Sequence, residues 1–580
     1  MIVRPRFVYG IPVLAPPPPI LQSGVAPLSV HLFSDYATEG DESDRFRNCF
    51  YEWDFGDPES GVWAATGKPK NKAYGAATAH VFEEPGTYRV DLEVRDDTGV
   101  VATESYGIEV LDPDLVYAGM NTTCVTNAGD SDFTGSPVGS RQISTDDLST
   151  ITQYAEAGNR ILFKRGASWT TAGLSWPSNA GPVTIGAYGS GAAPEINVSS
   201  GTFLSLGGRQ DWRVVDLHLN GVRDNNAFSG AVSMQRLLIM RVSAMSFDWG
   251  INISHWNGSD SMQNRDIAIV DCQFVGSVTY GAFIGAERLV IMGSMFLNTE
   301  YSHAFRAWQA YRSVISNNVF AGTNIVDDRG RQALTVRGPD ESSITPTPST
   351  GTGELVHRTE FTVISDNIVG GSGPWPTTIA PQNETTDARI SNIIFERNRI
   401  ASDYGEQAPT LVSQALLIGA SYVAVRNNIF DATGSANSYT AVRIYRLAAT
   451  PHRYGNEVYN NTFFRSDAAT GTHTAVLLQV DTHDAVVRNN LVSYPAVTGT
   501  VNVISDSSTG LVESNNLSID DPLYQDPDNE DPLARDFRLQ DGSAAIDAGT
   551  TVPVFDDHSG APRPNGADFD LGAFEFEGGT

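Results

Sequence analysis

The chain has little cysteine and little lysine, and these two shortages limit the kinds of stabilising site and ligand that the sequence allows. The three cysteines, Cys49, Cys124 and Cys272, lie far apart and show no metal-ligand spacing, which excludes a disulfide framework and a zinc site. Lysine occurs at only four of the 38 basic positions. Arginine is the better side chain for bidentate recognition of carboxylate or sulfate, so an anionic polymer is a candidate ligand.

Long apolar runs and a surplus of positive charge are also absent. No run of about 18 apolar residues occurs, so no membrane insertion is expected. The formal net charge of -30 argues against unaided binding to nucleic acid or acidic lipid. The 580 residues can form two or more domains, and 41% hydrophobic residues suffice for a sizeable core.

A repeated motif of apolar strand, asparagine and apolar pair occurs seven times between residues 313 and 520. Its asparagines are 26 to 49 residues apart, a period typical of a solenoid. Each amide has a donor and an acceptor, so stacked asparagines can bond one another at an inner bend. Cys272 and Ser294 occupy the equivalent place upstream. The column, which predicts a parallel β-helix, is Asn318, Asn367, Asn398, Asn428, Asn461, Asn490 and Asn516.

Two strands per coil are predicted from the match between residues 283–296 and 417–430. In both segments apolar residues alternate on either side of a Gly-Ala corner, as in strands with one buried face. The apolar runs are too short for the spacing of a helical repeat. The sequence therefore favours an all-β solenoid over a helical solenoid or a propeller.

Composition and motifs divide the chain into five segments. The amino terminus lacks the apolar core and cleavage signal of a secretory peptide, and four consecutive prolines predict a stiff arm that docks on another protein. Residues 146–158 are expected to form a short capping helix. The segments are a docking arm at 1–24, a β-sandwich at 25–111, the start and cap of the solenoid at 112–200, the β-helix at 201–520 and a closing segment at 521–580.

Two resemblances to known families follow from local motifs. The segment YEWDFGD at 51–57 and the Pro-Gly-Thr-Tyr hairpin within 80–99 resemble the PKD domain, which implies an immunoglobulin-like β-sandwich that acts as a spacer or adhesion module. Asp54 and Asp57 are interpreted as hydrogen-bonded turn residues, and calcium binding is left undecided. No other cofactor is predicted.

The strand at 160–169 and the end of the chain at 537–549 and 570–575 resemble pectate-lyase-like right-handed parallel β-helix proteins. Such proteins include lyases, hydrolases, isomerases and adhesins, so this resemblance implies a fold and no particular reaction.

A binding face is expected along one sheet, because successive coils set side chains about 4.8 Å apart in rows that follow an extended polymer. If Phe305 and Ala307 point inward, their neighbours point outward. A base near the uronate C5 proton and a cation beside the carboxylate would support elimination. Solvated or paired side chains are the alternative. The candidate catalytic residues are Tyr301, His303, Arg306 and Arg337.

Other side chains are candidates for ligand binding, through aromatic stacking or through charge. No metal ligands are predicted. The paired carboxylates and the motifs of the polygalacturonase family are missing, so a lyase is favoured over a glycoside hydrolase if the chain is an enzyme, which is left undecided. The ligand-binding candidates are Trp308, Arg331, Trp256, Arg443 and Arg446.

Two functional hypotheses stay open. The architecture resembles bacteriophage tail spike and head decoration proteins. This implies a virion protein that recognises host surface glycan or another acidic polysaccharide, contacts other virion proteins through residues 1–24 and forms a homotrimer. The alternative is a secreted bacterial polysaccharide lyase or adhesin. Neither hypothesis includes nucleic acid as a partner.

Overall fold

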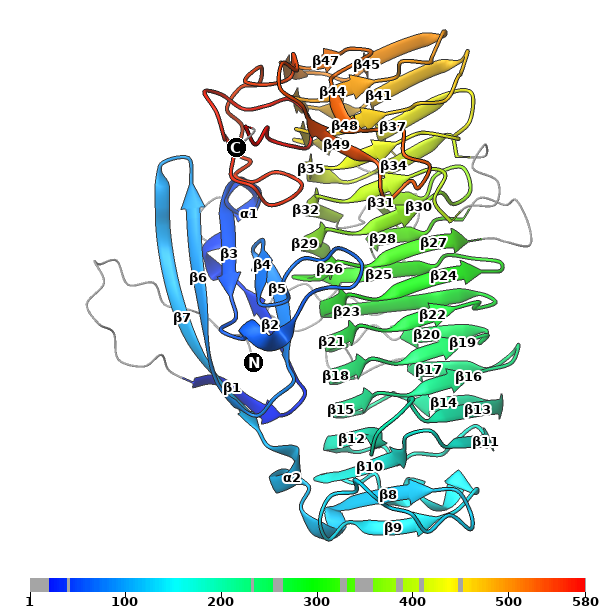
Figure 1. Cartoon of the computed structure of the whole chain (residues 1–580). Coiled ribbons are helices and arrows are strands. Elements are labelled where there is room, and N and C mark those ends of the chain that lie inside the picture. The colour runs from blue at the N-terminus through cyan, green and yellow to red at the C-terminus, as the bar shows by residue number, and fades with distance from the viewer. Residues whose placement is uncertain are drawn as a thin grey trace. The chain divides into compact units, whose positions relative to one another are not determined.

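The computed structural model describes residues 20–38, 42–230, 234–253, 264–323, 331–338, 358–381, 390–405, 412–446 and 452–578. The chain divides into two compact units (Figure 1). Unit 1 holds the described residues up to Asp35 and those from Tyr51 to Leu297. Unit 2 holds the described residues from Tyr36 to Phe50 and from Asn298 onward. Within the described ranges, none of the helices combines the length and apolar composition needed to cross a membrane.

A β-sandwich forms the N-terminal part of the fold. Trp53 in its core is 1% exposed, and its Nε1 donates to the carbonyl of Gly75 at 2.9 Å. β2 (Leu28–Phe33) pairs antiparallel with β5 (Ala77–Phe82). The main sheet has the order β1 (Ile20–Val25), β7 (Gly99–Leu111), β6 (Gly86–Asp96), β3 (Phe50–Asp54) and β4 (Lys72–Tyr74).

The remainder of the described chain is a right-handed parallel β-helix. Each coil has three strands, one in each of three sheets that we call I, II and III in chain order. Sequence reasoning read only two strands per coil, because the third strand is the short segment after the asparagine. In a coil of unit 1, for example, sheet I contains β20 (Trp249–Ile253), sheet II contains β21 (Arg265–Val270) and sheet III contains β22 (Gln273–Val275).

In unit 1 the parallel strands pair rung upon rung. Sheet I also contains β14 (Thr202–Ser205), β17 (Asn226–Gly230) and the first half of β23 (Tyr280–Met292). Sheet II also contains β8 (Thr122–Thr126), β10 (Asn159–Lys164), β12 (Ala180–Tyr188), β15 (Gln210–Val215), β18 (Gln235–Met240) and the second half of β23. Sheet III also contains β11 (Ser168–Ala172), β13 (Glu195–Ser200), β16 (His218–Asn220), β19 (Ser243–Met245) and β24 (Met295–Thr299).

Unit 2 repeats the same three-sheet coil. Its sheet I contains β25 (Phe305–Tyr311), β28 (Leu334–Gly338), β31 (Thr377–Pro381), β34 (Gln414–Ile418), β37 (Tyr439–Ile444), β41 (Thr472–Leu478) and β45 (Thr500–Asp506). Its sheet II contains β26 (Val314–Ser316), β29 (Thr359–Ser365), β32 (Ile390–Glu396), β35 (Ser421–Arg426), β39 (Glu457–Tyr459), β43 (Val486–Arg488) and β46 (Val512–Ser514). Its sheet III contains β27 (Val319–Thr323), β30 (Ile368–Gly370), β33 (Arg399–Ala401), β36 (Ile429–Asp431), β40 (Thr462–Phe464), β44 (Leu491–Ser493) and β47 (Leu517–Ser518).

The predicted asparagine column is confirmed at the turn between sheets II and III. From Asn318 to Asn516, each Nδ2 donates to the Oδ1 of the asparagine on the next rung at 2.9 to 3.1 Å. Upstream, the backbone N–H of Cys272 donates to Ser294 Oγ at 3.0 Å. The residue before each column asparagine has a left-handed φ of 51 to 59°. The stacked hydrogen bonds offset the cost of this sharp bend.

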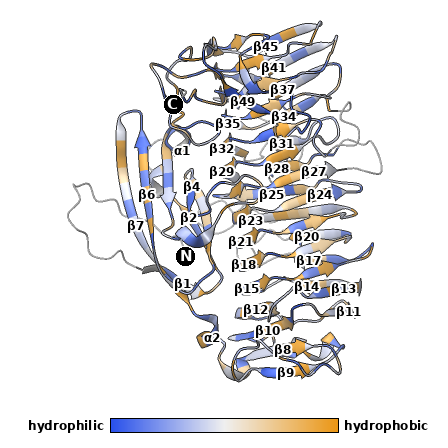
Figure 2. Cartoon of the chain, viewed as in Figure 1, coloured by the Kyte–Doolittle hydropathy of each residue, from blue (hydrophilic) through white to orange (hydrophobic). Residues whose placement is uncertain are grey.

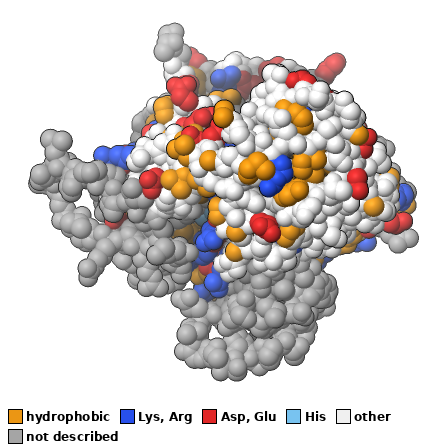
Figure 3. All heavy atoms as spheres, turned by 90° about the horizontal axis from the view of Figure 1, so that it is seen from below, with side chains coloured by type: hydrophobic (Ala, Val, Ile, Leu, Met, Phe, Trp, Pro, Cys, Tyr) orange, Lys and Arg blue, Asp and Glu red, His pale blue; other side chains and the backbone are white. Residues whose placement is uncertain are grey.

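The interior of the coil is apolar. Figure 2 shows hydrophobic residues interspersed with polar ones along the strands of the coil. Alternate residues of the sheet I strands, such as Phe305, Leu334 and Val442, are fully buried. The predicted capping helix is wrong. Residues 146–158 contain two 3-10 turns, η4 (Leu148–Thr150) and η5 (Thr152–Tyr154). At this end β9 (Arg141–Ser144) pairs with β8, and Figure 3, which views unit 1 from this end, shows hydrophobic side chains interspersed with polar ones.

Segments distant in sequence pack against the outer side of the coil. In unit 1, Arg213 of sheet II donates from Nε to the carbonyl of Pro27 at 2.9 Å, and Lys70 pairs with Asp271 at 2.6 Å. In unit 2, Phe46 of α1 (Glu42–Asn48) meets Phe361 of sheet II edge to face at 5.3 Å. The coil residues in these contacts lie on sheet II or in the turn from sheet II to sheet III, and none of them lies on sheet I.

A network of buried ion pairs ties the closing segment to the coil of unit 2. Arg397 is 2% exposed and pairs with Asp366 at 3.1 Å, with Glu396 at 2.8 Å and with Asp556 at 2.8 Å. Burial alone would raise the pKa of Glu396, but Arg397 and Arg426 lower it below its ordinary value. The closing segment therefore lies along the side of the coil, where its short hairpin joins β48 (Tyr524–Asp526) to β49 (Asp536–Leu539).

Candidate functional site

The candidate residues of β25 and β28 lie on neighbouring rungs of sheet I in unit 2. Arg306 pairs in register with Thr335. Phe305 and Ala307, on either side of Arg306, are fully buried, while the Arg306 side chain is only half-buried. Burial on either side of Arg306 thus follows the predicted alternation, but Trp308, the next residue expected to point outward, is buried. Arg337 lies two residues beyond Thr335 and is also half-buried.

His303 lies just before β25 and is 5% exposed. Its Nδ1 accepts a hydrogen bond from the backbone N–H of Gln332 at 3.1 Å. Burial lowers the pKa of His303 well below its ordinary value, and the guanidinium groups of Arg306, Arg337 and Arg331 lower it further. His303 is therefore a neutral imidazole. Because Nδ1 acts as the acceptor, the ring proton lies on Nε2.

This protonation state changes the role that His303 can play. A general base needs an available lone pair, and the Nδ1 lone pair is used by the Gln332 N–H. A neutral imidazole with a proton on Nε2 can instead donate a hydrogen bond to an anionic ligand group. Of the two predicted base candidates, Tyr301 is the one that solvent reaches, since it is 41% exposed.

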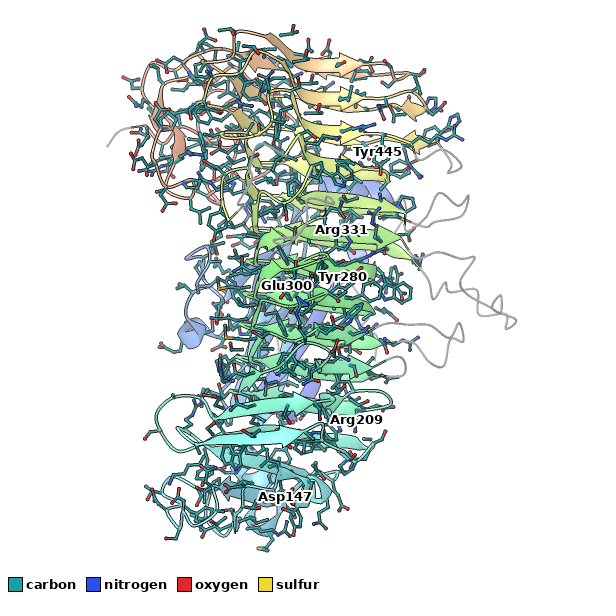
Figure 4. All side chains as sticks on the ribbon, turned by 90° about the vertical axis from the view of Figure 1, so that its right-hand side faces the viewer. Asp147, Arg209, Tyr280, Glu300, Arg331 and Tyr445 are labelled. Carbon is teal, nitrogen blue, oxygen red and sulfur yellow. The ribbon has the colours of Figure 1, made fainter. Side chains whose placement is uncertain are left out.

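Two of the candidate arginines donate hydrogen bonds to backbone carbonyls. Arg331 Nε donates to the carbonyl of Tyr301 at 3.4 Å, and Arg337 Nη1 donates to the carbonyl of Pro381 at 3.1 Å. Figure 4 shows Arg331 and Glu300 on the same side of unit 2. The structure thus brings together four predicted residues, with Tyr301 at their edge. We call His303, Arg306, Arg331 and Arg337 the central cluster.

Of the two aromatic candidates, Trp308 is the one that the structure describes, and it offers no exposed stacking surface. Trp308 is 8% exposed, so the open ring expected for sugar stacking is not available. Trp256 lies outside the described residues. Further along sheet I, Thr335 and Thr378 are 0% and 1% exposed, so the middle of this face is covered. One register row joins Arg306, Thr335, Thr378, Leu417 and Arg443.

The arginines at the far end of that row are partnered by polar side chains. Arg443 donates to Gln414 Oε1 at 3.2 Å and to Gln479 Oε1 at 3.1 Å, and its guanidinium lies 5.5 Å from the ring centre of Tyr445. Arg446 pairs with Asp481 at 2.8 Å. Both predicted arginines therefore belong to one polar corner at the end of sheet I.

Sequence reasoning did not single out His452 and Tyr454, which also belong to this corner. β38 (Arg453–Tyr454) and β42 (Thr482–His483) pair in parallel in the connection from sheet I to sheet II. The rings of His452 and Tyr454 stack on His483, with centres 4.9 and 5.0 Å away. A sequence signal for these residues was available, because polar and aromatic side chains follow the sheet I strand in two consecutive coils.

Metal ligands are not gathered in the part of the chain that the structure describes, where no group of three or more His, Cys, Asp or Glu is placed to hold an ion. Asp54 accepts from the backbone N–H of Gly56 at 2.9 Å, and Asp57 bonds His80 at 2.9 Å. The Asp54 bond is typical of a turn aspartate, whereas Asp57 bonds a histidine 23 residues away.

Residues 33–110 match the family model of the PKD domain, which confirms the resemblance inferred from the YEWDFGD segment. Among solved structures, the chain is similar to the pectate lyase Pel9A, with 12% identity, a TM-score of 0.39 and coverage of 78% of this chain and 97% of that chain. It is also similar to an alginate lyase from a Paenibacillus species, with 14% identity, a TM-score of 0.31 and coverage of 67% and 99%.

A third similar structure is the tailspike protein gp49 of Acinetobacter baumannii bacteriophage Fri1, a capsular polysaccharide depolymerase. The identity is 13%, the TM-score is 0.31, and the match covers 84% of this chain and 76% of that chain. These similarities assign no activity to this chain.

Proposed function

We propose that the chain binds an acidic polysaccharide along sheet I of unit 2. The observation that carries the proposal is the central cluster, in which three guanidinium groups lie close enough to the buried His303 to lower its pKa. Arg443 lies in the same register row four rungs further on, which is about 19 Å at the usual strand spacing. Thr335 and Thr378 between these ends are buried, so a polymer that contacts both ends would pass over the covered middle of the face, with one anionic group held at each end.

Arginine suits this task because its planar guanidinium bonds a carboxylate or sulfate through two parallel N–H groups. The net charge of -30 repels a polyanion at long range, so recognition depends on these local arginines. We therefore expect the ligand to carry spaced single charges on a sugar chain, whereas a nucleic acid carries a dense charge that the whole molecule opposes.

Lyase activity is a second candidate, because a cation beside the uronate carboxylate lowers the barrier to removal of the C5 proton. Arg306 and Arg337 would supply the cation, and Tyr301 in its deprotonated form would take the C5 proton. The electron pair of the C5–H bond would form the C4–C5 double bond as the C4–O bond breaks, and the glycosidic oxygen would leave with the proton taken up by Tyr301. The donor geometry of His303 favours binding of the anionic group over a role as this base.

We also propose that this binding face acts outside a cell, on a bacteriophage particle that attaches to host surface glycan. The support is the combination of a β-sandwich and a β-helix with a proline-rich arm, and a secreted bacterial protein is the alternative. Light scattering of the purified chain tests the homotrimer. Mass spectrometry of purified particles tests the virion location.

Affinity electrophoresis tests the binding proposal. Alginate, pectate and bacterial capsule are compared with neutral dextran, using the wild type, an Arg306→Gln/Arg337→Gln double variant and Arg538→Gln, whose exposed arginine lies in the closing segment. We expect retardation by an acidic polymer and a loss of about 10- to 100-fold in affinity in the double variant only. Failure to bind any acidic polymer, or equal binding by all three proteins, would refute the proposal.

Ultraviolet absorbance of unsaturated uronate ends tests the lyase candidate on the same polymers. Activity that disappears in Tyr301→Phe while binding persists would establish elimination by Tyr301. Binding without any rise in absorbance would leave recognition as the function for those polymers.

A further inference from the structure

Arg453 of β38 is a buried cation with unmet hydrogen-bonding capacity. It is 3% exposed. Among the described residues, neither Nε nor Nη2 of Arg453 has a hydrogen-bond partner, and both atoms are buried. Most buried donors in folded proteins are satisfied, and a buried charge without a partner costs several kcal/mol. Such a group calls for an anion at this place.

The surroundings of Arg453 are polar and positively charged. Its backbone pairs with Thr482, whose Oγ1 donates to the carbonyl of Gln479 at 2.6 Å. Burial lowers the pKa of Arg453 to about 10, and it is also affected by Tyr445, which raises it, and by Arg446, which lowers it. With this pKa the guanidinium is charged at neutral pH. The charges of Tyr445 and Arg446 are therefore close enough to Arg453 to affect its pKa.

The same corner contains the arginines already placed at the end of sheet I. Arg443 bonds Gln479 and lies over Tyr445, and Arg446 pairs with Asp481. These contacts hold Arg443 through an amide and Arg446 through a carboxylate. The side chains of Arg446 and Asp481 are 27% and 40% exposed, so this pair marks the solvent side of the corner.

We propose that this corner is a separate oxyanion subsite, in which Arg453, with Arg446 beside it, binds a carboxylate or sulfate group carried by a sugar. Tyr445, which forms part of it, lies on the same face of unit 2 as Arg331 of the central cluster (Figure 4). The subsite would hold a second charged residue of the same polymer. That assignment of the polymer rests on the proposed function, whereas the presence of an oxyanion subsite does not.

Arg453→Met tests the subsite, because it replaces the buried charge with an apolar side chain of similar length. The unliganded variant is expected to have a Tm equal to or above that of the wild type, because an unpaired buried charge is removed. The same variant is expected to lose the stabilisation that an oxyanion gives. A purely structural arginine would show the opposite, a lower Tm and an unchanged response to anions.

The experiment measures the Tm of the full chain with sodium galacturonate, sodium sulfate, sodium chloride at equal ionic strength and neutral galactose. At one hundred times Kd, the wild type is expected to gain about 5 °C with galacturonate or sulfate. The response of one but not the other identifies the anion class. An equal response to chloride, or none to either oxyanion, would overturn the proposal, as would a full response by Arg453→Met.

Two further variants separate this subsite from the central cluster. The Arg306→Gln/Arg337→Gln protein is expected to keep the oxyanion response, even if polysaccharide binding fails. Arg538→Met, at an exposed arginine of the closing segment, is expected to match the wild type. An oxyanion response that is lost in the double variant but kept in Arg453→Met would place the anion at the central cluster and refute the subsite.

Discussion

Replacing Asn428 by leucine tests the asparagine column directly. Asn428 is fully buried, and its Nδ2 donates to Asn461 Oδ1 at 3.0 Å and to the carbonyl of Phe395 at 2.9 Å. Its Oδ1 accepts from the backbone N–H of Asn398 at 2.9 Å and from Asn398 Nδ2 at 3.1 Å. Leucine has a similar volume, so the change removes four hydrogen bonds and opens little space.

The cost follows from the donors left behind. Two N–H groups of Asn398 lose their acceptor inside the coil, and each buried unsatisfied donor costs about 1 to 3 kcal/mol. The total is on the order of 4 kcal/mol. For a unit of this size, each kcal/mol lowers Tm by about 2 °C, so we expect a decrease of about 8 °C.

Asn516→Leu is the matched control at the last rung of the column. Asn516 accepts from Asn490 Nδ2 at 2.9 Å, but it is only part-buried, so water can replace the lost bonds. We expect a decrease of about 2 °C or less. Thermal unfolding followed by circular dichroism at one scan rate compares both variants with the wild type. Equal Tm values for Asn428→Leu and the wild type would refute the view that the stacked amides stabilise the coil.

The remaining predictions concern a charge network, a histidine and a docked helix. Arg397→Met leaves three buried carboxylates without their cation and is expected to lower the free energy of unfolding, measured in urea, by about 3 to 5 kcal/mol. Arg538→Met breaks an exposed ion pair and is expected to lower it by about 1 kcal/mol or less. Equal effects of the two variants would contradict the role of burial. The lowered pKa of His303 means that the unfolded chain binds a proton that the folded chain does not. The contribution of His303 to stability is therefore complete above pH 6.5 and is lost as the pH falls from there towards the folded pKa. The Tm of His303→Gln should therefore depend less on pH than the Tm of the wild type. Identical curves of Tm against pH would show that His303 contributes nothing. Phe46→Ala removes a fully buried ring and is expected to lower the stability by about 3 to 5 kcal/mol, which is measured as faster hydrogen exchange in α1. Unchanged exchange in α1 would show that the contact with Phe361 does not hold the helix.

The repeat period, the inner amide column and the alternating strands were predictable from the sequence. Asn428 and its counterparts recur at rung spacing, and an inward amide at a bend has few alternatives to bonding its neighbours. The pattern of buried residues on either side of Arg306 was predictable for the same reason, because alternation along a strand is a local property. The third strand of each coil was missed because it is only two or three residues long in most rungs, too short to show alternation.

The chemistry of the candidate site was decided by tertiary structure. His303 was a candidate base until Gln332 and three arginines were placed around it, because protonation depends on burial and on charges from other rungs. The docking of Arg47 beside Glu457 joins residues 410 apart in the chain, which no local pattern records. Arg453 lay in an ordinary polar segment of the sequence. The fold buries its guanidinium, and burial is what turns an unpaired arginine from a solvated surface group into a place that needs an anion.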